Sequence, residues 1–318
     1  MSKAWNGPIT DAHHHFWDPQ ANFHPWLAEG ASVPFRYGDY TSIKRRYLPP
    51  EYFKDAGEHQ VVQTVYVETE WDPSDPIGET RFIEQIAARY GVPNAVVAQA
   101  WLDHPEAATV LAQQAAFASV RSVRHKPGGP TSPQQVGERR TLMSDEHWRR
   151  SYSTLHGLGL NFDLQTPWWN LPEAERLARD FPETTLILNH AGLPSDRSEQ
   201  GLAGWRTAMA ALAQQPNVMV KISGLGQRGR RWSVQDNAWI VGEIIAMFGV
   251  DRAMFASNFP VDSLCGSFDA IYSGFKHMVR DLPLADQERL FHSNAQRIYR
   301  CQPCAVARPA QAQTRSQA

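Results

Sequence analysis

Cysteines and long apolar runs are both scarce in this sequence of 318 residues. Its three cysteines are too few for a disulfide framework. Two of them form Cys301-Gln-Pro-Cys304, which we interpret as part of a C-terminal tail, because no second pair completes a zinc or redox site. No segment approaches the roughly 18 uninterrupted apolar residues of a membrane span, and the N-terminus lacks a signal-peptide pattern. We therefore expect a cytoplasmic protein without membrane contact.

An excess of charge of one sign is also absent. The formal net charge is −2, with 31 basic and 33 acidic residues mixed along the chain. Nucleic acids and anionic membrane surfaces need a basic patch, so neither is expected as a partner. A small molecule remains the expected partner, and a homo-oligomer remains possible.

Short apolar runs alternate with longer amphipathic segments along the chain. Eight runs resemble buried parallel strands, with several rich in β-branched residues: Pro8–Ala12, Val61–Val67, Ala95–Trp101, Ser119–Arg124, Leu160–Leu164, Thr185–Asn189, Asn217–Ile222 and Arg252–Ala256. Eight segments have a helical pattern: Pro76–Tyr90, Pro105–Phe117, Asp145–Leu158, Pro172–Phe181, Gly204–Gln215, Val234–Phe248, Phe268–Asp281 and Leu284–Tyr299. This α/β alternation without a break predicts one domain, a single (β/α)8 TIM barrel over residues 1–300.

Two segments do not fit the alternation. Residues 16–46 are long, aromatic and rich in proline, which predicts an extended loop after the first strand that could act as a lid. Residues 301–318 have no apolar period and are predicted to be a disordered tail.

Polar side chains follow several predicted strands at the end where barrel enzymes place their active sites. Asp11, His13 and His15 end the first strand, and alternation places them on one side with His14 on the other. His190 ends the sixth strand. We expect His13, His15 and His190 to face one cavity, where they could hold a metal or a substrate oxygen.

The motifs at these strand ends resemble the amidohydrolase superfamily, in particular its amidohydrolase-related branch of small lactonases and some decarboxylases. They occur in the family's order from residue 8 to 300: Thr10-Asp-Ala-His-His-His-Phe-Trp-Asp18, Ser122-Val-Arg-His125, Leu186-Ile-Leu-Asn-His-Ala-Gly-Leu-Pro194, Val220-Lys-Ile-Ser-Gly224, Met254-Phe-Ala-Ser-Asn-Phe-Pro-Val261 and Asn294-Ala-Gln-Arg-Ile-Tyr299. The resemblance implies a metal-dependent-hydrolase-like barrel. It is greatest to hydrolases of sugar lactones and aromatic lactones.

The resemblance also implies a site. In such families the His-x-His pair, the strand-six histidine and a strand-eight aspartate surround a divalent metal such as zinc or, in some lactonases, bind substrate without metal. Here these positions are His13, His15, His190 and Asn258. The asparagine departs from the pattern, because an amide neither takes a proton from water nor supplies negative charge to a cation. Three alternatives follow: no metal and another base, a weakly bound metal, or no catalysis.

Several carboxylates could replace the missing aspartate. Asp262 lies four residues beyond Asn258 and could fold back over the barrel mouth as the base. Glu68 and Glu70 end the second strand on one side and could line the site. Asp163 could orient a histidine or pin a loop.

Cations and aromatic residues complete the predicted site. Arg124 and Lys221 end strands four and seven, where they could bind a substrate carboxylate or an oxyanion, or form an ion pair that closes the barrel. His125 is predicted to bind substrate beside them. Aromatic residues near the strand ends could stack on a ring or pack under the loops: Phe16, Trp17, Trp26, Trp168, Trp169 and Phe259. Trp17 is the one assigned to substrate binding.

The expected function is hydrolysis of a lactone of a sugar acid or an aromatic-degradation intermediate, with water attacking the carbonyl. His190, Asn258 and Asp262 are the predicted catalytic residues, and the substrate is expected to be anionic. A metal-dependent decarboxylase of the same branch is the alternative, although Asn258 argues against it. A barrel that binds a ligand without catalysis is a further alternative.

Overall fold

Eight parallel strands are hydrogen-bonded in chain order in the computed structural model, which describes residues 4–303. They are β1 (Ile9–His14), β2 (Val61–Val67), β3 (Ala95–Gln99), β4 (Val120–Arg124), β5 (Asn161–Leu164), β6 (Leu186–Leu188), β7 (Val218–Ile222) and β8 (Ala253–Phe255). The chain after β8 returns to β1, where His15 N donates to Phe259 O at 2.8 Å and Asn258 N donates to His13 O at 2.8 Å. The predicted (β/α)8 barrel is confirmed.

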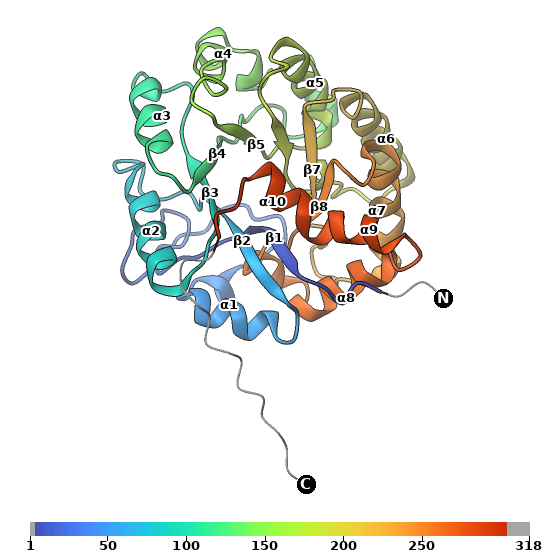
Figure 1. Ribbon diagram of the computed structural model, residues 1–318. Helices are drawn as coiled ribbons and strands as arrows, with labels where there is room; N and C mark the ends of the chain where they lie inside the picture. Colours follow the sequence, from blue (N-terminus) through green and yellow to red (C-terminus); the bar gives the residue numbers. More distant parts are fainter. Residues whose placement is uncertain (1–3, 304–318) are drawn as a thin grey trace.

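Helices surround this barrel on all sides (Figure 1). They are α1 (Pro49–Ala56), α2 (Gly78–Tyr90), α3 (Ala107–Ala115), α4 (Glu146–Tyr152), α5 (Leu171–Asp180), α6 (Glu199–Leu212), α7 (Val234–Phe248), α8 (Phe268–Met278), α9 (Leu284–Glu288) and α10 (Asn294–Ile298). Serine side chains cap the N-termini of several helices. At α6, Ser198 Oγ accepts a hydrogen bond from Gly201 N at 3.0 Å, so this helix begins five residues before the predicted position. The last predicted helix is divided by a π-helical turn, Arg289–Ser293, between α9 and α10.

Helix α1 was not predicted from the apolar pattern. It begins at two prolines, which fit the first turn of a helix because their missing N–H groups need no partner there. Glu51 also accepts a hydrogen bond from Leu48 N at 2.9 Å, which closes the first turn. The segment 16–46 is confirmed as a loop, with one short 3-10 turn at Thr41–Ile43.

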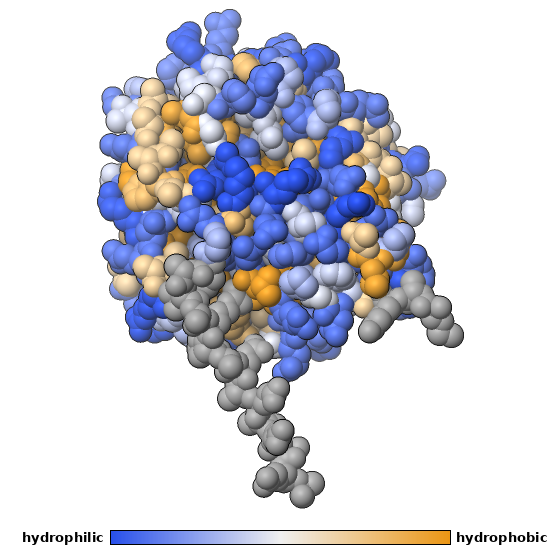
Figure 2. Space-filling model, viewed as in Figure 1, coloured by the Kyte–Doolittle hydropathy of each residue, from blue (hydrophilic) through white to orange (hydrophobic). Residues whose placement is uncertain are grey.

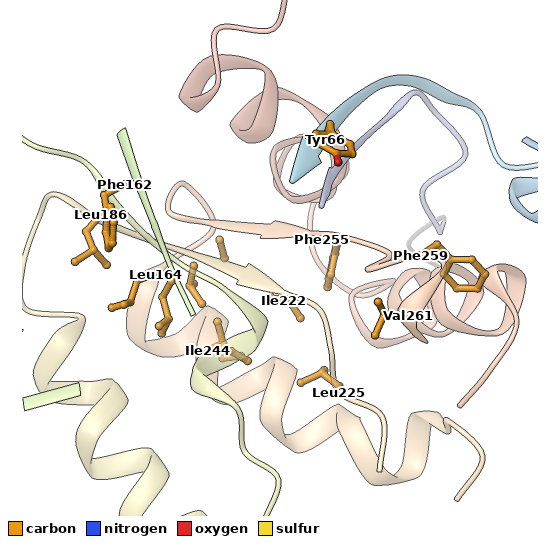
Figure 3. Packing of buried hydrophobic residues seen from close by; sticks show 14 of the residues in the cluster. Tyr66, Phe162, Leu164, Leu186, Ile222, Leu225, Ile244, Phe255, Phe259 and Val261 are labelled. Atoms are coloured by element: carbon orange, nitrogen blue, oxygen red, sulfur yellow. The ribbon is translucent and has the colours of Figure 1, made fainter. Parts of the chain in front are cut away.

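The apolar core has two layers. The larger layer lies between strands and helices, where Figure 3 shows Phe162 of β5 beside Leu186 of β6, and Leu164 of β5 near Ile244 of α7. The smaller layer fills the barrel and includes Val65, Val67, Val97, Met254 and Tyr299. Since Tyr299 belongs to this layer, the chain after α10 closes the N-terminal end of the barrel, across which α10 is seen in Figure 1. The active-site end therefore lies on the far side of that view.

The face that carries α10 is mostly hydrophilic, with hydrophobic residues in small scattered groups (Figure 2). Within residues 4–303, no helix is both long and apolar enough to cross a membrane. Gln302 is held against the barrel, because its carbonyl accepts from Asn94 Nδ2 at 3.0 Å and its side chain donates to Ala118 O at 2.9 Å. Most of the predicted tail, with Cys304, lies outside the described residues.

Candidate active site

Three histidine rings meet at the C-terminal end of the barrel. The ring centroids of His13 and His15 are 5.0 Å apart, and those of His13 and His190 are 4.5 Å apart. His14 points the other way and packs on Phe16 and Tyr52, with centroid distances of 4.4 and 4.9 Å. The sequence pattern therefore places all four rings on the sides where they are found.

A β-bulge in β1 lies between Asp11 and His14 and changes the side of the strand on which Asp11 lies. Asp11 pairs with Thr64 and His14 pairs with Tyr66, so β1 has one residue more than β2 over this stretch. The bulge shifts the alternation, and the prediction that Asp11 shares the side of His13 and His15 is wrong. Asp11 points away from the cavity and accepts hydrogen bonds from Tyr52 Oη at 2.7 Å and Ser257 Oγ at 2.6 Å.

The three rings are neutral at ordinary pH. Burial lowers the pKa of His13 well below its usual value, and the charge of Lys221 adds to the effect. Burial and the charge of Arg124 lower the pKa of His15 to about 3. Burial, with Arg36 as the next contribution, also lowers the pKa of His190 well below its usual value. A neutral imidazole keeps one lone pair and one N–H, so each ring can accept and donate.

Two of the rings are oriented by hydrogen bonds. His15 Nδ1 donates to Val67 O at 2.8 Å, and His190 Nδ1 is 2.9 Å from Ser223 Oγ. Both nitrogens of His13 are buried and have no hydrogen-bond partner among residues 4–303. The side chain of Asn258 is also hydrogen-bonded to His15. A ring held through one nitrogen by a carbonyl or hydroxyl group is also typical of metal-binding histidines.

The donor set nevertheless does not fit a divalent metal as it stands. In the described part of the chain, no group of three or more histidine, cysteine, aspartate or glutamate side chains is arranged to hold a metal ion. The fourth position holds the neutral amide of Asn258, whereas the carboxylate Asp262 lies behind it. Three imidazoles alone can hold a catalytic zinc, but the rings in the described part of this chain are not arranged as a metal site, and an amide replaces the strand-eight carboxylate. We derive no step through a metal.

Asn258 and Asp262 form a buried hydrogen-bonded pair. Asn258 Nδ2 donates to Asp262 Oδ1 at 2.6 Å, and Tyr37 Oη donates to the same oxygen at 2.9 Å. Arg36 Nη2 lies 3.6 Å from that oxygen. Burial raises the pKa of Asp262 in spite of these partners. Asp262 thus folds back as predicted, but Asn258 separates it from the cavity.

Arg124 and Glu68 form a second buried pair. Arg124 Nε donates to Glu68 Oε1 at 2.5 Å, and its Nη2 donates to Glu68 O at 2.6 Å. Burial would raise the pKa of Glu68, but the charges of Arg124 and Lys126 hold it below its usual value. Glu68 is therefore ionised and a weak proton acceptor.

These groups surround a cavity of about 390 Å³. The cavity is lined by seven of the predicted site residues: His15, Trp17, Glu68, Glu70, Arg124, His190 and Asn258. Trp26 and Phe35 add apolar wall, and Trp26 Nε1 donates to Thr69 O at 2.7 Å. Phe16 and Phe259 are buried in the core instead.

Lys221 does not reach this cavity. It is completely buried inside the barrel, where its Nζ lies 2.7 Å from Asp163 Oδ1 and 4.8 Å from the centre of the Tyr299 ring. Asp163 also accepts from Tyr299 Oη at 2.9 Å and from Asn189 Nδ2 at 2.8 Å. The prediction that Lys221 contacts substrate is wrong, and the alternative of an ion pair that closes the barrel is confirmed.

His125 also lies away from the cavity. Its Nδ1 accepts from Leu102 N at 3.1 Å and from Trp148 Nε1 at 3.0 Å. Arg124 faces the cavity, so the next residue of the extended chain faces the surrounding helices. The prediction that His125 binds substrate is wrong for this reason.

Arg36 is the cavity residue that the sequence did not indicate. It comes from the loop 16–46, lines the cavity and lies beside Asp262. Loop residues have no periodic pattern, and only the suggestion of a lid pointed to this segment. Gln165, which accepts from Arg124 Nη1 at 3.1 Å, was missed for the same reason.

Comparison with known proteins identifies the family. A family model described as amidohydrolase matches residues 10–301. The chain belongs to the amidohydrolase family. The family model and the lactonase-named relatives support an enzyme of the hydrolase type.

Two curated relatives cover nearly the whole of this amidohydrolase. An uncharacterized protein of Sinorhizobium fredii is 39% identical over 92% of this chain and 98% of its own length. An L-fucono-1,5-lactonase of Burkholderia multivorans is 27% identical over 91% of this chain and 95% of its own.

Solved structures support the fold assignment. An amidohydrolase of Burkholderia multivorans with bound HEPES has a TM-score of 0.75 and 25% identity, covering 93% of this chain and 100% of that chain. A structure described in the same way, with bound zinc, has a TM-score of 0.76 and 24% identity over the same shares.

Proposed function

We propose that this amidohydrolase is a lactonase that opens a sugar-acid lactone by water attack at the carbonyl. The observation that carries the proposal is the meeting of the neutral imidazoles of His15 and His190 beside Arg124 in one cavity of about 390 Å³. The ring of His13 contacts both imidazoles but is fully buried and does not line the cavity, contrary to the prediction. A cavity of this size suits a single sugar ring. The relative named L-fucono-1,5-lactonase supports this substrate class.

His190 is proposed to polarise the lactone carbonyl. If Ser223 Oγ donates to His190 Nδ1, the neutral ring carries its proton on Nε2 and can donate toward the substrate oxygen. A depressed pKa keeps an imidazole neutral while it acts as such a donor. The negative charge that develops on the carbonyl oxygen is further stabilised by the guanidinium of Arg124.

Asp262 is proposed to accept the proton of the attacking water and to return it to the ring oxygen when the ester C–O bond breaks. The products are a hydroxyl group and a carboxylic acid, and ionisation of the acid releases the proton that a pH-stat measures. Its raised pKa makes it a better acceptor than Glu68, whose charge Arg124 neutralises. Because Asn258 lies between Asp262 and the cavity, the amide must release Asp262 and bind the water in its place. His15 completes the wall of the site, with the buried ring of His13 against it, and neither residue exchanges protons in this scheme.

A lactone panel tests the proposal. Ring opening releases a proton, so turnover can be followed with a pH-stat on L-fucono-1,5-lactone and related sugar lactones. His190→Gln should lower kcat/KM by about 100-fold or more, the usual effect of losing one oxyanion donor. His147→Gln, at an exposed histidine of α4, is the matched control and should change nothing. Turnover of no lactone, or turnover that His190→Gln leaves unchanged, would contradict the proposal.

Elemental analysis of protein purified without chelator belongs to the same experiment. We expect turnover to continue after dialysis against EDTA. Turnover that is lost with the chelator and restored by zinc would show that a metal, rather than Asp262, activates the water.

A further inference from the structure

A second and larger cavity opens onto the candidate active site. It has a volume of about 970 Å³ and shares Arg36, Lys126, Gln165 and Leu193 with the inner cavity. Its walls come from residues 31–44 of the long loop and from residues 128–131 and 165–169 after β4 and β5. We call this outer cavity the vestibule. A molecule longer than a single sugar ring, with its reacting group at His190, would extend into it.

The vestibule is lined by more positive than negative side chains. Arg36, Lys44, Lys126 and Arg228 face one carboxylate, that of Asp39. Asp39 is engaged locally, because it accepts hydrogen bonds from the backbone N–H and the hydroxyl of Thr41 at 2.9 and 2.6 Å. Outside the vestibule lining, Asp262 lies 3.6 Å from Arg36 and Glu70 lies 2.5 Å from Lys126. The excess positive charge of the vestibule is therefore that of Lys44 and Arg228.

Two of these cations keep free hydrogen-bond donors. Arg228 forms no ion pair within residues 4–303, and Nη1 of Arg36 is buried without a partner in the same part of the chain. Lys44 donates to the carbonyls of Ala28 and Ala31, and Lys126 pairs with Glu70 at 2.5 Å. A buried guanidinium nitrogen without a protein partner takes its acceptor from water or from a bound ligand, so Arg36 has a donor to offer to an anion here.

The backbone of the long loop lies close to the exposed side chain of Arg228. A Cβ at Gly38 would lie only 3.1 Å from Arg228 Nε, so the absence of a side chain lets the guanidinium approach the loop. Gly38 also has a φ of +91°, a conformation that favours glycine. The loop and Arg228 thus form one wall of the vestibule.

We propose that the vestibule binds an anionic group, a carboxylate or a phosphate, at the far end of the substrate. The substrate is then a lactone that is longer than one sugar ring and carries its charge away from the scissile ester. Trp169, Phe35 and Pro34 give the vestibule apolar surface for the connecting part of the molecule. This inference rests on the proposed lactonase function for the reaction, but the anion site can be tested without turnover.

The kinetic test compares lactones that share one ring. A neutral sugar lactone is compared with the same ring extended by a carboxylate and with the same ring extended by a phosphate. Arg228→Gln should lower the ratio of kcat/KM for anionic to neutral lactone by about fivefold, as expected for a solvent-exposed charge pair. Arg231→Gln, on the same loop and outside both cavities, should leave the ratio unchanged. An unchanged ratio in Arg228→Gln would overturn the inference while the lactonase proposal stands.

The binding test needs no reaction. Glutarate and inorganic phosphate are titrated by calorimetry into the wild type, Arg228→Gln and Arg231→Gln at low and high salt. Weaker binding in Arg228→Gln alone supports the anion site even if no lactone is turned over, and the better ligand distinguishes carboxylate from phosphate. Equal binding in all three proteins, or no binding, would overturn the site.

Discussion

Asn258 donates a hydrogen bond of 2.6 Å to Asp262, so the neutral amide stands between the cavity and the buried carboxylate. The strand-eight position therefore presents an amide to the substrate, and the carboxylate is one hydrogen bond further back. This relationship determines what each of the two residues contributes, and the two can be tested separately.

Asn258→Asp should raise the affinity for zinc. The substitution adds a carboxylate to three neutral imidazoles and completes a common hydrolytic ligand set. It also places two carboxylates in direct contact, which repel each other unless a proton or a cation lies between them. We expect a lower melting temperature without zinc and recovery with zinc, measured by thermal unfolding and by elemental analysis. Equal zinc content in variant and wild type would contradict this.

Asp262→Asn should lower turnover by about 100-fold or more if Asp262 is the base, since general bases contribute about 10²–10⁴. Glu70→Gln is the control, because Glu70 lines the cavity but pairs with Lys126 at its rim. Initial rates on the best lactone measure both variants. A large loss in Glu70→Gln with little effect in Asp262→Asn would reverse the assignment.

Stability should fall as the pH drops below about 6.5. Burial lowers the pKa of His13, His15 and His190 in the folded protein, whereas the unfolded chain titrates near 6.5. Below that pH the unfolded chain binds more protons, so protonation favours unfolding. Urea unfolding between pH 8 and 5 measures the slope, which should be smaller in His15→Gln. The same slope in variant and wild type would show that His15 titrates normally.

Glu79 should make a contribution to the pH dependence of stability that is opposite to that of the three histidines. Burial, and then the charge of Glu68, raise its pKa from 4.5 to about 7. The folded protein thus holds a proton that the unfolded chain loses above pH 4.5, and stability from this group is lost as the pH rises toward 7. Glu79→Gln keeps an acceptor for Tyr66 Oη and removes the titration. The melting temperature of Glu79→Gln relative to that of the wild type should therefore be higher at pH 8 than at pH 5. The same difference in melting temperature at both pH values would contradict this prediction.

Lys221→Met should destabilise the barrel by about 3–5 kcal/mol, because it leaves Asp163 charged and buried without its cation. The double variant Lys221→Met, Asp163→Leu should recover most of the loss, because both buried charges are then absent. Urea unfolding measures both proteins. A single variant as stable as the wild type would show that the pair is not needed.

The barrel could be predicted because buried parallel strands are nearly continuous apolar runs, and Val61–Val67 was predicted to the residue. The polar strand ends also indicated six of the cavity residues: His15, Glu68, Glu70, Arg124, His190 and Asn258. Asp11 was misplaced because the bulge in β1 depends on pairing with a distant strand, which alternation does not contain.

Lys221 and Arg124 looked equivalent from their positions at strand ends. Lys221 is withdrawn into the barrel by Asp163 of β5, whereas Arg124 is held at the cavity by Glu68 of β2. Whether a cation at a strand end faces the cavity or the barrel interior thus depends on its ion-pair partner on another strand, which the local sequence does not contain. Arg36 was missed because its place follows from the path of a long loop, not from a period in the sequence.

Tyr299, which fills the end of the barrel and donates to Asp163, has a consequence for biosynthesis. The ion pair beneath the histidines is covered only when the last helix has been made, and β1 meets the chain after β8 equally late. During translation, His13 and His15 therefore leave the ribosome early. The site that contains them can form only when nearly the whole chain has been made. A chain that ends before Tyr299 would leave Lys221 and Asp163 open to water.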